Sequence, residues 1–201
     1  MKEYLKKYIE ENYKVIKIIG ICFICGLVIG IFIYAFIDDG IKNEFIITLK
    51  NTLDLSKANN FENINIIKNG MVANGILMFI IYFCSLTILA PMLICMTTFF
   101  KSFSIGIYIP IIFSVFGISK GFLVVLLMII IPNILYIPAF MFSTTNAIKF
   151  HYFLFEEREN NIIFRCFKEF VDVLISFSII ILSVVLEQLL ITNIINIYCT
   201  L

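Results

Sequence analysis

The strongest constraint on this chain is an uninterrupted apolar run of 20 residues at positions 18–37, followed by several other long apolar stretches. A helix rises about 1.5 Å per residue, so about 20 apolar residues cross the roughly 30 Å hydrocarbon core of a bilayer. About 17 mostly polar residues precede the run, and no small-x-small cleavage site follows it, which argues against a cleaved signal peptide. The run is therefore expected to stay in the membrane as an anchor.

Composition supports the same class. The chain is 61% hydrophobic and 14% charged, with a mean hydropathy of +1.04, whereas soluble domains carry roughly 25% charged residues. Lipid is the solvent that accepts so much apolar surface. The formal net charge of +1 gives no electrostatic case for a nucleic-acid partner, so membrane lipid is the expected surrounding partner.

The apolar runs predict an all-α, polytopic integral membrane protein that forms a single membrane domain over residues 1–201. About five transmembrane helices are expected, at 15–37, 75–99, 103–118, 121–142 and 171–191. The third is the shortest, and it is either one arm of a tight hairpin with the fourth, around Ser119 and Lys120, or a partly re-entrant segment.

Lysine and arginine positions predict the orientation, because cytoplasmic loops are enriched in both. An inside N-terminus and an outside C-terminus place ten of the 15 basic residues in the cytoplasm. These ten are Lys2, Lys6, Lys7, Lys14, Lys17, Lys101, Lys149, Arg158, Arg165 and Lys168.

Three amphipathic segments lie between the predicted spans. Residues 1–17 are typical of a helix lying on the cytoplasmic face, and residues 149–169 form a cytoplasmic loop with mixed charges. Residues 38–70 form an external loop with an apolar stripe of Ile41, Phe45, Leu49 and Leu53. The stripe either lies on the bilayer as an interfacial helix or is a surface for binding a partner.

Small residues at Gly26 and Gly30 fall on one face of the first helix. Such spacing allows a second helix to approach closely, and it fits either packing within the chain or contact in a homo-oligomer.

The predicted fourth helix contains Pro132 and Pro138, with Asn133 and Tyr136 between them. Each proline removes a backbone donor and bends the helix. The break either lines a substrate path or is a simple kink, with its freed carbonyls satisfied by Asn133, Thr144 or a neighbouring helix.

Glu187 is a carboxylate deep in the fifth apolar run. It lies about 24 Å from residue 171 at 1.5 Å per residue, close to the outer headgroups, so an interfacial position is expected.

Chemistry-bearing motifs are scarce. His151 is the sole histidine, which excludes a histidine-rich metal site, and no nucleophile elbow or phosphate-binding loop appears. The six cysteines lie mostly in apolar runs and imply no disulfide framework. We expect no catalytic residue, cofactor or metal.

Several motifs together resemble the stage II sporulation protein M family. The resemblance covers the second to fifth predicted helices, and its most specific part is the stretch from Ile131 to Ala139. The residues that carry it are Lys101, Gly106, Pro132, Asn133, Tyr136, Pro138 and Glu187. Broader relatives have a Pro-His-Gly pattern and a glutamate where this chain has Pro132-Asn133-Ile134, which weakens any ionisable role for that motif here.

The resemblance implies a non-enzymatic scaffold in the cell membrane of an endospore-forming bacterium, acting during engulfment of the forespore. It also implies that the scaffold gathers two peptidoglycan hydrolases, the sporulation proteins D and P, at the mother-cell and septal membrane. The competing class is a transporter or permease-like subunit, whose pathway would use the interrupted third and fourth helices.

Overall fold

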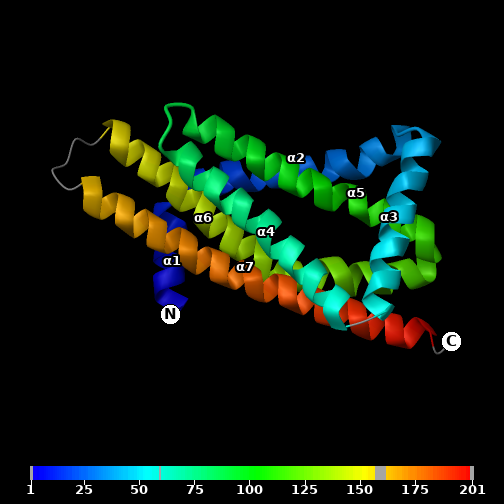
Figure 1. Cartoon of the computed structure of the whole chain (residues 1–201). Coiled ribbons are helices and arrows are strands. Elements are labelled where there is room, and N and C mark those ends of the chain that lie inside the picture. Colours follow the sequence, from blue (N-terminus) through cyan, green and yellow to red (C-terminus); the bar gives the residue numbers. More distant parts are fainter. Residues whose placement is uncertain (1, 59, 157–161, 200–201) are drawn as a thin grey trace.

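The computed structural model describes the backbone of residues 2–58, 60–156 and 162–199, and side chains for residues 3, 6–51, 67–155 and 163–190. The described backbone is helical apart from short connections, which confirms the all-α prediction (Figure 1). In chain order the elements are α1 (Lys2–Glu11), α2 (Tyr13–Phe36), α3 (Asp39–Ala58), α4 (Asn60–Ser85), α5 (Ala90–Val125), the π-helix η1 (Leu126–Ile130), α6 (Ile131–Glu156) and α7 (Ile162–Cys199).

Four helical stretches of the described chain are long and apolar enough to cross a membrane: Tyr13–Phe36, Ile67–Ser85, Ala90–Phe155 and Ile163–Leu190. The third has 66 residues and would extend for roughly 99 Å if it were straight, far more than one crossing needs. Gly117 breaks it, with a φ of 72° and a ψ of 174°. This conformation is essentially confined to glycine.

The chain folds back at Gly117. A Cβ on Gly121 would lie 2.8 Å from Cδ1 of Phe113, so residues on the two sides of the break are in contact. In Figure 1, α5 runs toward the right and α6 returns toward the left. The predicted hairpin is therefore present, and its turn lies at Gly117 instead of Ser119 and Lys120, which are helical.

The predicted boundary between the second and third spans is wrong. The structure ends α4 at Ser85 and begins α5 at Ala90, with Pro91 in its first turn. Proline suits a first turn because the N–H that it lacks would have no partner there. Lys101, which the sequence placed in a cytoplasmic loop, consequently lies within α5, and the span beginning at Ala90 is not the short one expected.

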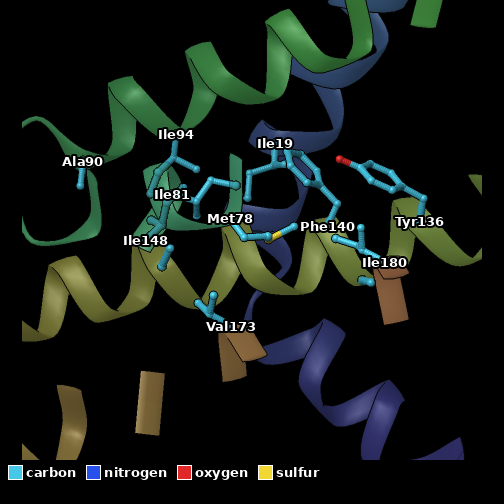
Figure 2. Close-up of a cluster of buried hydrophobic side chains, with 12 residues drawn as sticks. Ile19, Met78, Ile81, Ala90, Ile94, Tyr136, Phe140, Ile148, Val173 and Ile180 are labelled. Atoms are coloured by element: carbon cyan, nitrogen blue, oxygen red, sulfur yellow. The ribbon is translucent and has the colours of Figure 1, made fainter. Parts of the chain in front are cut away.

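The main apolar core joins α2, α4, α5, α6 and α7. Figure 2 shows Ile19 of α2, Met78 and Ile81 of α4 and Phe140 of α6 pointing toward one another. Each of these side chains is almost completely buried. The core thus fixes the relative positions of five helices that are distant in sequence.

The glycines of α2 pack against α5 within the chain. A Cβ on Gly26 would overlap Oγ of Ser102, and a Cβ on Gly30 would lie 3.1 Å from Cα of Gly106 while overlapping the carbonyl oxygen of Phe103. Only glycine allows the two backbones to come this close. Of the two interpretations left open by the sequence, the structure shows the intramolecular contact.

Two helices lie outside the long bundle. Tyr8 of α1 donates a 2.6 Å hydrogen bond to Oδ1 of Asn146, and its ring is 5.4 Å from that of Phe142, which ties α1 to α6. The predicted external loop at 38–70 contains α3 and the start of α4, and α3 lies across the bundle beside the bend in α5 (Figure 1). Helix also extends into 149–169, as the end of α6 and the start of α7.

Candidate functional site

A cavity of about 340 Å³ opens among α3, α4, α5, η1, α6 and α7. Five of the seven family-motif residues line it: Lys101, Pro132, Asn133, Tyr136 and Glu187. Three different helices supply them, so the fold brings together residues up to 86 positions apart (187 − 101). Gly106 instead packs against Gly30, and Pro138 is exposed.

Lys101 is held by contacts from two other helices. Its Nζ donates a 3.1 Å hydrogen bond to Oδ1 of Asn74 and lies 4.8 Å from the ring centroid of Tyr136. Asn74 is itself fixed, since its Nδ2 donates a 2.9 Å hydrogen bond to the carbonyl of Gly70 one turn earlier. An amide dipole and an aromatic face together replace part of the hydration that an ammonium loses in a membrane protein.

Glu187 faces the same cavity from α7. It attracts Lys101 electrostatically, yet among the described residues its carboxylate makes no hydrogen bond and no ion pair within 4 Å. The neighbouring Gln188 is only 5% exposed and also lines the cavity. The sequence predicted an interfacial position for Glu187. The structure shows in addition that its side chain lines a cavity between helices.

The segment around Pro132 lines the cavity, and two backbone carbonyls there accept hydrogen bonds from side chains. Asn133 Nδ2 donates a 2.7 Å hydrogen bond to the carbonyl of Ile129, and Ser183 Oγ donates one of 2.8 Å to the carbonyl of Pro132. The π-helix η1 precedes the segment, with the Ile131 N–H bonded to the carbonyl of Leu126, five residues back. Such π turns occur frequently at functional sites. The sequence suggested that Thr144 would donate to the carbonyls freed by the prolines, but it donates instead to the carbonyls of Phe140 and Met141.

One wall of the cavity comes from α3. Phe45, Thr48 and Leu49 line it, and Leu49 is only 7% exposed because it packs among Ile111, Ile112, Val124 and Val125. Phe45 is 38% exposed and Ile41 is 49% exposed. The side chain of Leu53 lies outside the described residues.

The family model for Stage II sporulation protein M matches residues 16–196 of this chain. The chain belongs to that family. Membership confirms the resemblance drawn from the motifs and implies a role in sporulation. No curated protein and no solved structure matches the chain.

Two polar residues of this Stage II sporulation protein M family member escaped the sequence reasoning. Asn74 lines the cavity, and Ser183 joins α7 to α6. Each is a polar side chain within an apolar helix, and such residues usually face the interior of a bundle. That signal was available, but it does not say which polar residues meet.

Proposed function

We propose that the protein is a non-enzymatic membrane scaffold of the engulfment complex, which recruits and localises peptidoglycan hydrolases for thinning of the septal wall. The match to the Stage II sporulation protein M family over residues 16–196 is the observation that carries this proposal. By the same resemblance, the hydrolases are the sporulation proteins D and P.

The proposed topology has five crossings, with the N-terminus inside and the C-terminus outside. It follows from dividing the stretch Ala90–Phe155 at Gly117 into two crossings. In this topology nine of the 15 basic residues fall on the inner side, five fall on the outer side, and Lys101 lies within the bundle. The bias toward the inside is thus retained.

Partner docking is proposed on α3. In this topology α3 lies outside, where wall hydrolases act. Because Leu49 is packed inward, Ile41 and Phe45 are the members of the stripe that remain exposed among the described side chains.

A gene deletion tests the sporulation role directly. The deletion strain should grow normally and stall during engulfment, and equal spore yields with and without the gene would contradict the assignment.

Docking is tested by Ile41→Glu combined with Phe45→Glu. The double variant should accumulate normally in the membrane and lose co-purification of the hydrolases. Ile47→Glu is the matched control, since Ile47 is exposed on the same helix and outside the stripe. Retention of the hydrolases by the double variant would exclude α3 as the docking surface.

Topology is tested by single cysteines at the two short connections, introduced into a chain lacking its native cysteines. Thr87 and Ser119 are both exposed, on opposite sides of the proposed membrane. An impermeant thiol reagent added to intact cells should modify Ser119→Cys and leave Thr87→Cys unmodified. The reverse pattern, or labelling at both positions, would refute the arrangement.

The cavity favours a second candidate function, a transporter or permease-like subunit. Lys101→Met separates the two functions. A scaffold with this substitution should still support engulfment when it accumulates normally, whereas a transporter that uses the cavity should fail.

A further inference from the structure

The cavity holds one positive and one negative side chain that do not neutralise each other at close range. Lys101 and Glu187 both line it, farther apart than the 4 Å limit of a salt bridge. Phe45, Leu49 and Ile112 contribute apolar walls. Opposite charges from two helices, α5 and α7, therefore border one cavity that also has apolar walls.

The two charges also have unused bonding capacity. An ammonium has three N–H donors, and Lys101 uses one for Asn74. A carboxylate has about four acceptor positions, and Glu187 uses none of them on the described residues. Charged groups within a membrane protein normally pair or face a polar ligand path, because burying an unpaired charge is costly.

We propose that this cavity binds a small zwitterion, with its carboxylate or phosphate on Lys101 and its ammonium on Glu187. One such molecule complements both side chains at once, which neither a simple anion nor a simple cation does. The cavity volume of about 340 Å³ lies at the lower end of the range of ligand sites, roughly 300–1,000 Å³. Its size suits a molecule with few non-hydrogen atoms.

Two sources supply this chemistry: a free amino-acid-like zwitterion, or the phosphoethanolamine head group of a lipid. In the first arm, the unfolding temperature of purified full-length protein in detergent is measured with glycine or phosphoethanolamine. Sodium acetate, inorganic phosphate and methylammonium chloride at equal ionic strength are the controls. In the second arm, native mass spectrometry measures retention of phosphatidylethanolamine against phosphatidylglycerol.

Stabilisation by glycine or phosphoethanolamine, without stabilisation by the singly functional ions, is expected for a free zwitterion. Selective retention of phosphatidylethanolamine is expected for a lipid head group. Absence of both effects would overturn the proposal.

Lys101→Met and Glu187→Gln should each weaken binding of the responding probe roughly tenfold or more, since each removes a charge-assisted contact. Lys68→Met is the matched control, because it removes an exposed lysine of α4 outside the cavity lining. If Lys101→Met fails to fold by size-exclusion chromatography, the near-isosteric Glu187→Gln decides the question. Unchanged binding by the folded charge variants would refute the site. The assay needs no sporulation partner, so its result is independent of the scaffold proposal.

Discussion

Two faces of α5 lie in opposite environments. One face, with Ser102 and Gly106, meets the glycines of α2 so closely that no Cβ fits at those glycines. The other face, one residue away at Lys101, borders a cavity lined by both polar and apolar side chains. Successive residues of a helix point about 100° apart, so a single segment supports both environments. Close packing on one side gives the cavity-lining side a rigid position.

Substitution at the packed face should have the largest effect. Gly30→Leu places a side chain against the Phe103 carbonyl and Gly106, both backbone, which cannot move aside alone. We expect a loss of roughly 3 kcal/mol, the upper end of the usual cost of overpacking, or failure to fold, measured by thermal unfolding in detergent.

Gly20→Leu on the same helix is the control, because the nearest atom to its added Cβ is Cε of Met141 at 4.0 Å. Equal stability of the two variants would show that the α2–α5 contact is not close-packed.

A second glycine variant distinguishes lack of space from backbone conformation. Gly117→Ala adds a Cβ with no atom within 4 Å, but the φ of 72° is unfavourable for alanine. We expect a loss of roughly 1–3 kcal/mol from backbone strain alone. A gain in stability would mean that the turn between α5 and α6 does not require glycine.

On the cavity side, removing one interhelical hydrogen bond should have a smaller effect. Ser183→Ala deletes the donor to the Pro132 carbonyl and should cost roughly 0.6–1.7 kcal/mol. Ser178→Ala is matched to it, since the hydrogen bond of Ser178 to the Leu174 carbonyl stays within α7. If Ser178→Ala lowers stability as much as Ser183→Ala does, the hydrogen bond between α6 and α7 contributes no more than one within a single helix.

The smallest expected effect has the opposite sign. Tyr136 is 4% exposed, and its hydroxyl has no hydrogen-bond partner among the described residues. Tyr136→Phe keeps the ring beneath Lys101 and removes a buried polar atom, so unfolding temperature should stay constant or rise slightly. A clear fall would show that the hydroxyl has a partner in solution.

Apolar length predicted the membrane class and the presence of the first and last spans, because those signals are local. It misplaced the second boundary at Lys101, since a lysine is usually a span end and nothing nearby in sequence shows that Asn74 and Tyr136 support it. Motif resemblance selected Lys101, Tyr136 and Glu187 without indicating that they share a cavity. That property depends on how each helix is rotated about its axis, which only tertiary packing determines.

The π-helix η1 has a consequence for how the family can vary. Its hydrogen bonds span five residues, so the segment contains one more residue than an α-helical path would need. Deleting a single residue between Leu126 and Ile130 would restore a regular ladder with the same flanking partners, because the Ile131 N–H and the Leu126 carbonyl would then be four residues apart. Asn133 and Tyr136 would therefore keep their side of the helix. A deletion in a regular α-helical part of α6, between η1 and Asn133, would instead turn both residues by about 100°. The π turn is thus the one place in this segment where a homologue can lose a residue and keep its cavity lining.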